Sequence, residues 1–285
     1  MKSKLPRIIG FNGRSPEKAA LLPPDISSAQ GSRSTGEQSV TIAIYSVKGG
    51  VGKTTFAANL AWCSAVTHGR KTLLWDLDAA GGSAFLYGLE ANGRRAAEDV
   101  FTRDRTPSEL IQATDFAGLE LLPADESIRA LDAQLVRIGK RRRLPKLVQE
   151  LSANYERILL DCPPVMNELS AQVVRAADLV IVPLPPSPLS SRALDLVVRE
   201  IAQSSKRHPP ILPVLSMVDP RRALHRQACE ANPTWPIIPY ASAVEQCAVR
   251  QRPVGALAPR SSAAEAFARL YRAIEAKLEQ RAVSQ

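Results

Sequence analysis

The chain has 285 residues, 45% hydrophobic and only 5% aromatic, with a formal net charge of +9. This length suffices for one large α/β domain or two small domains. The positive charge is compatible with a polyanionic partner, although a basic protein without such a partner would carry it equally well. The four cysteines are scattered, without a CxxC pair or a nearby histidine, which argues against a zinc site, an iron–sulfur cluster or a disulfide framework.

No stretch approaches about eighteen uninterrupted apolar residues, and the N-terminus lacks the apolar core of a secretory signal. We therefore expect a soluble, cytoplasmic protein. Residues 1–39 are rich in Pro, Ser, Gly and charge and show no sustained periodicity, which predicts a flexible N-terminal arm. Residues 40–285 are predicted to form a single domain.

From Val40 onward, short β-rich runs alternate with longer helical patterns. The predicted strands lie at 40–46, 71–78, 119–123, 157–164, 179–185, 211–218 and 236–240. The predicted helices lie at 53–67, 126–151, 168–177, 188–205, 221–231 and 262–280. Most of the strands are continuous apolar runs, which are typical of strands buried on both faces. The alternation predicts a doubly wound, mostly parallel β-sheet flanked by helices, with its ligand at the carboxyl ends of the strands.

A glycine-rich segment between the first strand and the first helix reads Val47-Lys48-Gly49-Gly50-Val51-Gly52-Lys53-Thr54-Thr55. This position is that of a phosphate-binding loop, in which glycines turn backbone N–H groups inward and the helix N-terminus adds positive charge. We expect Lys53 to reach the β- and γ-phosphates of ATP and the Thr54 hydroxyl to ligate Mg²⁺. The standard GxxxxGK[ST] pattern is not met, because Val47 takes the place of its first glycine. Lys48 is an additional lysine.

Acidic residues end two of the predicted strands. Asp76 and Asp78 lie at the end of one strand, where a carboxylate can hold Mg²⁺ through water or orient an attacking water. Asp161 follows the apolar run 158–160, the pattern of a Walker B strand, and is expected to contact the Mg²⁺ shell. A role as strand-end caps is the structural alternative for Asp76 and Asp78, and their register with the glycine-rich loop favours the metal.

The order of these segments resembles the ParA/MinD (Soj-like) family of P-loop ATPases with a deviant Walker A loop. The shared segments are KGGVGKTT, DLD, ILLDCPP, MVDPR and VGALAPRSSAAEAFARL, over residues 40 to about 275. The second half is most similar to the partition-type branch, in which DPRS precedes the final helix; here residues 258–261 read APRS. The resemblance implies a Mg²⁺-dependent ATPase whose hydrolysis is slow and stimulated by a partner.

The resemblance also implies a role for each matching residue. Lys48 corresponds to the signature lysine that reaches the partner's ATP across a nucleotide-sandwich homodimer. Lys53 and Thr54 correspond to the phosphate lysine and the Mg²⁺ threonine, Asp78 to the aspartate needed for hydrolysis, and Asp161 to the Walker B acid. A second lysine on the γ-phosphate makes dimerisation depend on ATP, so hydrolysis dissociates the dimer. An activating partner, either a ParB-like protein or a cargo adaptor, is implied as well.

Two departures from the family pattern concern hydrolysis and DNA. The family continues DxDPQGN, whereas Asp78 is followed by Ala79-Ala80-Gly81-Gly82-Ser83, which predicts a more pliable switch loop and an altered hydrolysis rate. In the stretch 237–246, the family's arginines are replaced by Tyr240 and Ala243.

Basic residues in the C-terminal half predict sequence-independent binding to DNA and an association with the nucleoid. The candidate contacts are Arg221, Arg222, Arg226, Arg250 and Arg252. Arg221 matches an arginine that partition ATPases place on the DNA backbone, and the others can replace the lost arginines. A merely solvated basic face is the alternative. The run Lys140–Arg143 predicts either a second basic patch or a polar helix face.

Three functions compete. The leading hypothesis is an ATP-switched DNA-surface ATPase that partitions or positions a chromosome, a plasmid or another large cargo. The second is a MinD-like ATPase on a membrane, which the C-terminal helix argues against, because Phe267, Leu270, Ile274 and Leu278 form the stripe of a core-packing helix. The third is a small-molecule kinase or ligase of the same architecture, and the sequence shows no chemistry for its acceptor pocket.

Overall fold

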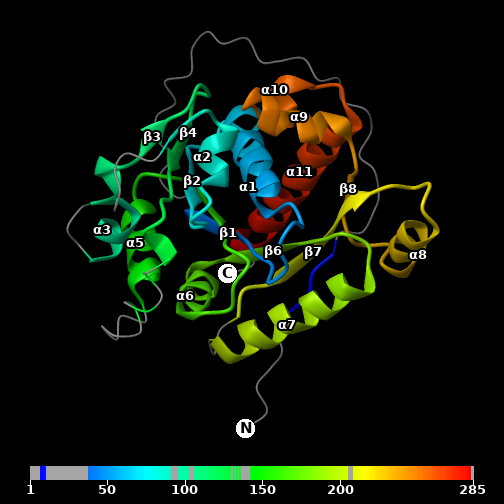
Figure 1. The fold of residues 1–285 in the computed structure, drawn as a ribbon, viewed down its shortest axis with the longest axis horizontal. Helices are drawn as coiled ribbons and strands as arrows, with labels where there is room; N and C mark the ends of the chain where they lie inside the picture. Colours follow the sequence, from blue (N-terminus) through cyan, green and yellow to red (C-terminus); the bar gives the residue numbers. More distant parts are fainter. Residues whose placement is uncertain are drawn as a thin grey trace.

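The computed structural model describes residues 7–10, 38–90, 96–102, 106–129, 131, 133, 135, 142–204 and 208–283. Their centre is an eight-stranded sheet in the order β3-β4-β2-β5-β1-β6-β7-β8. All neighbouring strands are parallel except β3, which pairs antiparallel with β4. The predicted doubly wound, mostly parallel sheet is confirmed (Figure 1). The strands are β1 (Val40–Ile44), β2 (Thr72–Asp76), β3 (Gln112–Ala113), β4 (Leu119–Leu122), β5 (Arg157–Asp161), β6 (Leu179–Leu184), β7 (Ile211–Val218) and β8 (Ile237–Pro239).

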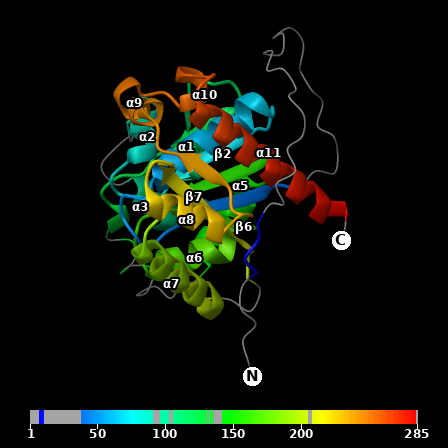
Figure 2. The same ribbon diagram turned by 90° about the vertical axis from the view of Figure 1, so that its right-hand side faces the viewer.

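Helices cover both faces of the sheet (Figures 1 and 2). Every residue of β2, β5 and β6 is buried between these layers, as continuous apolar strands require. One face packs on α1 (Lys53–Trp62), its π-helical continuation η1 (Cys63–Thr67), α2 (Gly82–Leu86), α9 (Ser242–Arg250), α10 (Val254–Leu257) and α11 (Ser262–Val283). The other packs on α3 (Ala96–Thr102), α5 (Arg143–Leu151), α6 (Glu168–Ala176) and α7 (Pro188–Ser204). The remaining helices are η2 (Pro107–Glu109) and α8 (Ala223–Ala231).

The predicted helix 126–151 is wrong as a continuous element. Arg142 leaves the helical region with φ −135° and ψ 24°, and α5 begins only after it, with Pro145 in its first turn, where a missing N–H costs nothing. The side chain of Arg143 turns inward and donates to the carbonyl oxygens of Phe101 and Val100 at 3.1 and 2.6 Å. Arg143 therefore belongs neither to a surface patch nor to a polar helix face. Residues 140–141 lie outside the described residues.

A short part of the predicted N-terminal arm is attached to the sheet. Ile8 forms a parallel bridge with Ile211 at the start of β7, and the Ile211 N–H donates to the Arg7 carbonyl at 2.9 Å. The Ile9 N–H in turn donates to the Ile211 carbonyl at 2.8 Å. Residues 7–9 are thus held against the sheet, unlike the flexible arm predicted for residues 1–39, and residues 11–37 lie outside the described residues.

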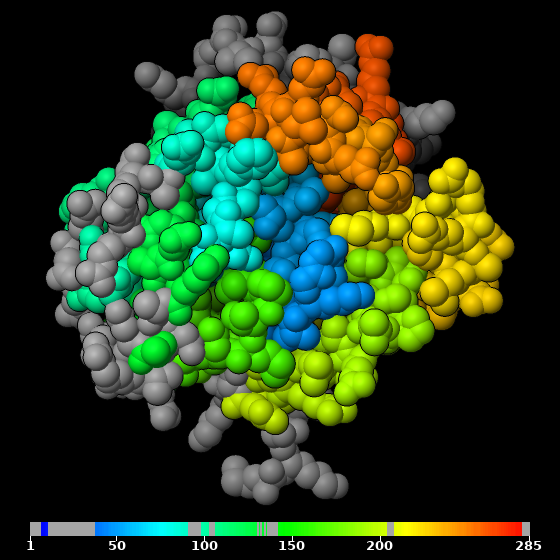
Figure 3. Space-filling model, viewed as in Figure 1, coloured from blue at the N-terminus to red at the C-terminus, as the bar shows by residue number. Residues whose placement is uncertain are grey.

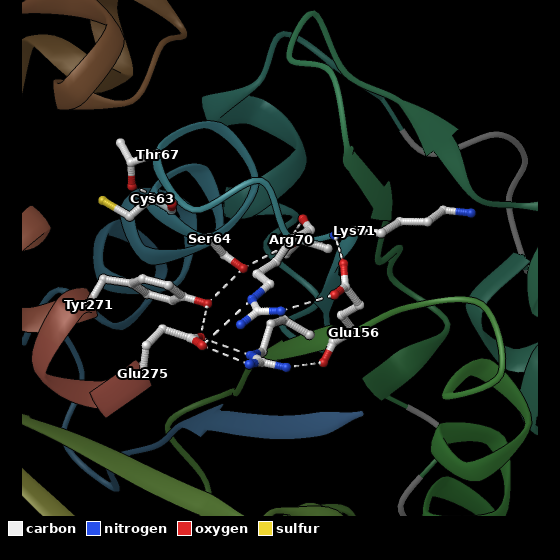
Figure 4. Close-up of polar contacts among 10 residues, drawn as sticks. Cys63, Ser64, Thr67, Arg70, Lys71, Glu156, Tyr271 and Glu275 are labelled. Atoms are coloured by element: carbon white, nitrogen blue, oxygen red, sulfur yellow. Dashed lines mark hydrogen bonds and ion pairs between the residues drawn. The ribbon is translucent and has the colours of Figure 1, made fainter. Parts of the chain in front are cut away.

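Buried polar side chains tie α11 to the amino ends of the strands (Figure 4). Arg157, the first residue of β5, donates two hydrogen bonds to Glu275 at 2.8 and 2.7 Å. The Tyr271 hydroxyl lies 2.6 Å from Glu275 Oε1 and 2.8 Å from Ser64 Oγ. Ser64 Oγ lies 2.7 Å from the Thr72 hydroxyl at the start of β2. This network fixes the C-terminal helix at the end of the sheet opposite to the glycine-rich loop.

The apolar stripe of α11 faces the protein core. Phe267, Leu270 and Ile274 are all buried, and Leu278 packs against the same cluster. The prediction of a core-packing C-terminal helix is confirmed for these residues. Among the described residues, no helix is long and apolar enough to cross a bilayer.

Candidate nucleotide-binding site

The glycine-rich loop connects β1 to α1 at the carboxyl end of the sheet. Gly50 and Gly52 adopt φ values of 69° and 92°, which side chains rarely tolerate. A Cβ on Gly49 or Gly50 would have no neighbour within 4 Å, so the backbone here faces open space. The first N–H groups of α1 have no acceptor within the helix. Figure 3 shows the blue segment with this loop at the surface, beside the cyan segment with α2. An anion fits this cradle.

Two residues of strand β7, Ser216 and Met217, lie against the glycine-rich loop. The Ser216 hydroxyl donates to the Val51 carbonyl at 3.3 Å, and Val51 itself is buried. Met217, the next residue of β7, adopts a φ of 54°, and a Cβ on Gly52 would lie 3.4 Å from its Cε. The loop therefore rests on a neighbouring strand that holds its shape.

The two lysines of the loop lie in different surroundings. Lys53, the first residue of α1, is 7% exposed, and burial lowers the pKa of its ammonium group, although Asp161 and Asp78 oppose this shift. Lys48 is partly exposed, and its backbone N–H donates to Ser46 Oγ at 3.2 Å. Lys53 is thus part of the charged interior of the site, whereas Lys48 lies nearer to its rim.

Asp76 and Asp161 form a buried carboxylate pair. They are register partners at the ends of β2 and β5, and both are fully buried. Burial raises the pKa of Asp161 to about 6, although the hydrogen bond from Ser83 and the nearby Thr54 hydroxyl lower it. Burial also raises the pKa of Asp76 well above its usual range, and repulsion from Asp161 adds to this shift. A cation beside the pair would relieve this electrostatic cost.

The groups around Asp161 fit Mg²⁺. Among the described residues, Asp161 Oδ1 is buried without a hydrogen-bond partner, and the Thr54 hydroxyl lies beside the same carboxylate. Carboxylate and hydroxyl oxygens are the donors that Mg²⁺ prefers. Asp76 is more engaged, because Oδ1 accepts the Asp78 N–H at 3.0 Å and Oδ2 the Ser83 N–H at 2.9 Å. Asp76 therefore fixes the backbone of the segment from Asp78 to Ser83. This role is additional to the metal-binding role predicted from the sequence.

The segment after Asp78 is held by hydrogen bonds, at variance with the expected pliability. Asp78 Oδ1 accepts the Ala80 N–H at 3.1 Å, and the Asp78 carbonyl accepts the Gly81 N–H at 2.9 Å. Gly81, with φ 63°, then leads into α2. The Ser83 hydroxyl donates to Asp161 Oδ2 at 2.8 Å. Nothing in the local sequence pattern pointed to Ser83, because its partner is far away in the chain.

Three of the candidate DNA contacts lie in and just after the MVDPR segment: Arg221, Arg222 at the N-terminus of α8, and Arg226 within α8. Arg221 is bound bidentately by Asp219, with both contacts at 2.9 Å, and this pairing lowers the pKa of Asp219 to about 2. Arg222 is 70% exposed and 3.9 Å from the same carboxylate. Arg226 donates to the carbonyl oxygens of Pro220 and Arg221, both at 3.0 Å. Arg226 thus supports the turn before α8, and Arg222 is the more available cation.

The other two candidates lie at the end of α9, a separate helix (Figure 1). Arg252 pairs with Asp115 at 3.5 Å, and its guanidinium lies 5.9 Å from the centre of the Phe116 ring. The side chain of Arg250 is exposed and has no hydrogen-bond or ion-pair partner within the described part of the chain. The predicted residues therefore form two groups, and Arg222 and Arg250 are the least engaged member of each.

Comparisons with known proteins agree with this fold. Residues 39–214 match the AAA_31 family, described as an AAA domain. The chain is 28% identical to the sporulation initiation inhibitor protein Soj of Bacillus subtilis, over 82% of this chain and 98% of that protein. It is 32% identical to the chromosome partitioning protein ParA of Caulobacter vibrioides, over 66% and 73%. An ATP complex of a Cyanothece McdA variant shares the fold, with a TM-score of 0.73, 19% identity and coverage of 84% and 98%.

Proposed function

Because the chain belongs to the ParA/MinD-like P-loop ATPases of the AAA_31 family, we propose that it is a dimerising ATP switch on DNA. In the ATP state the homodimer binds DNA without sequence preference and partitions or positions a chromosome, a plasmid or another large cargo. Hydrolysis resets the dimer, and an activating partner, either a ParB-like protein or a cargo adaptor, stimulates this step. This proposal places the protein on the nucleoid.

The loop Lys48–Thr55 binds the phosphates in this proposal. Its backbone amides and the buried Lys53 hold the β- and γ-phosphates, and Mg²⁺ bound at Thr54 and Asp161 would neutralise charge on these oxygens. Asp76 would hold the bound Mg²⁺ through water, and Asp78 would orient the attacking water. These proposed roles agree with the charge of each side chain and with its location at the carboxyl ends of the strands.

The observation that carries the dimer switch is the contrast between the two lysines. Lys53 is buried among the acids, whereas Lys48 remains partly exposed at the same phosphate cradle. Because Lys48 is partly exposed at the rim of its own site, its ammonium group is available to contact the γ-phosphate of the ATP bound by a second subunit. Dimerisation then requires ATP, and loss of the γ-phosphate removes the contact.

The membrane alternative has less support. The stripe of α11 that a bilayer would need is buried against the core at Phe267, Leu270 and Ile274. Exposed arginines, by contrast, are present on α8 and at the end of α9, and a dimer doubles the number of phosphate contacts that they make.

A co-sedimentation experiment tests the proposal. The protein is mixed with plasmid DNA or with anionic liposomes, each with Mg·ATP or Mg·ADP and at 50 and 200 mM salt, which are conditions chosen to separate charge-driven binding by about 10³-fold or more. We expect capture by DNA only with ATP, weaker at high salt. Capture by liposomes alone would contradict the proposal and favour a membrane-associated ATPase. Capture by neither DNA nor liposomes would also contradict it and favour a small-molecule kinase or ligase.

A further inference from the structure

Ser83 joins the two buried acids at the ends of neighbouring strands. It lies in the first turn of α2 and is fully buried. Its N–H donates to Asp76 Oδ2 at 2.9 Å, and its hydroxyl donates to Asp161 Oδ2 at 2.8 Å. One residue of the segment after Asp78 thus contacts both carboxylates of the site.

The Ser83 hydroxyl determines which oxygen of Asp161 remains available. Oδ2 is occupied by this hydrogen bond, whereas Oδ1 is buried without a partner among the described residues. A carboxylate can rotate about its terminal side-chain bond, and a donor on one oxygen fixes that rotation. Donors of this kind orient metal ligands, and their loss weakens metal binding.

The same segment also contacts the other expected oxygen ligand. A Cβ on Gly82 would lie 3.0 Å from Cγ2 and 3.4 Å from Oγ1 of Thr54. Residues 82 and 83 therefore adjoin Thr54 and Asp161, the two residues whose oxygens fit Mg²⁺. A displacement of this segment must disturb both of them.

We propose that Ser83 is a positioning residue for Mg²⁺: its hydroxyl aims Asp161 Oδ1 at the metal and links metal binding to the conformation of the segment after Asp78. The inference rests on the proposed nucleotide switch and adds to it a residue with no role in the sequence prediction. It implies that release of Mg²⁺ and movement of the segment after Asp78 occur together.

The test is a Mg²⁺ titration of the full chain with a fluorescent ADP analogue. For Ser83→Ala we expect the Mg²⁺ concentration at half-saturation to rise by about tenfold, the lower end of the effect of losing such a donor. Affinity for the analogue in EDTA stays at the wild-type level. Ser83→Cys replaces the hydroxyl with a slightly larger thiol that donates only weakly, and is expected to match Ser83→Ala.

Ser64→Ala is the matched control, because it removes another fully buried serine hydroxyl at the opposite end of β2. Its Mg²⁺ midpoint should remain that of the wild type. The proposal is overturned if Ser83→Ala keeps the wild-type midpoint, or if it loses affinity equally in EDTA, which marks a general structural defect. Failure of the wild type to bind DNA would refute the proposed function without changing this readout.

Discussion

Gly82 lies so close to Thr54 that a Cβ added to it would stand 3.0 Å from Thr54 Cγ2. Few real Cβ contacts are this short, so Gly82→Ala must displace the threonine side chain or the segment after Asp78. The backbone conformation is no obstacle, because Gly82, unlike Gly81, does not have a positive φ. The glycine is therefore needed for the space beside Thr54.

From this contact we predict that Gly82→Ala lowers kcat by about tenfold, since a small misplacement at a reacting centre is costly. Steady-state phosphate release at saturating Mg·ATP measures the effect. Thermal unfolding without nucleotide is the control and should change little, because the contact lies at the edge of the site. Wild-type turnover in this variant would show that the Thr54 position tolerates the shift.

Substitution of the two lysines of the loop should impair two different properties, dimerisation for Lys48 and ATP affinity for Lys53. Lys48→Ala should bind ATP but remain monomeric, because it loses only a contact to the second copy. Lys53→Ala should lose affinity for ATP itself, because its buried ammonium group serves its own subunit. Light scattering with a non-hydrolysable ATP analogue measures the first effect and equilibrium binding the second. A normal dimer of Lys48→Ala refutes the trans role.

The features that could be predicted from the sequence are those set by residues close together in the chain. The loop at Lys48–Thr55 and the strand-end acids follow from the order of strand, glycines and helix, so the sheet and the site could be located in advance. The missed features depend on distant partners. Ser83 meets Asp161 across 78 positions of the chain, and Arg143 meets Phe101 across 42. A basic run alone cannot reveal that one of its members caps buried carbonyl groups.

Among the arginines, we predict that Arg222→Ala weakens DNA binding more than Arg226→Ala does. Arg222 is exposed and only distantly paired, whereas Arg226 is held by two backbone carbonyls. Loss of one phosphate contact should weaken binding to all sequences alike and reduce the salt slope of the affinity by about 1. Fluorescence anisotropy with a random duplex at several salt concentrations measures both quantities. Equal slopes for the two variants would remove Arg222 from the interface.

The buried pair of Arg157 and Glu275 gives a prediction for stability against pH. Glu275→Gln should lower the free energy of unfolding at pH 7 by about 3 kcal/mol, because Arg157 is left buried without its counter-charge. Burial raises the pKa of Glu275, but the hydrogen bonds from Arg157 and Tyr271 outweigh it, so the folded pKa lies below its ordinary value.

A carboxylate with a lowered pKa stabilises the fold above its unfolded pKa of about 4.3, and this contribution disappears as the pH falls through the folded value. The difference between wild type and Glu275→Gln should therefore be full at pH 7 and shrink below about pH 4.3. Urea unfolding at pH 7 and at a pH below about 4.3 measures this difference in the free energy of unfolding. Glu279→Gln, on the exposed side of the same helix, is the control and should differ little from wild type at either pH. A difference that stays constant across this range would mean that Glu275 acts through packing and that its charge contributes nothing.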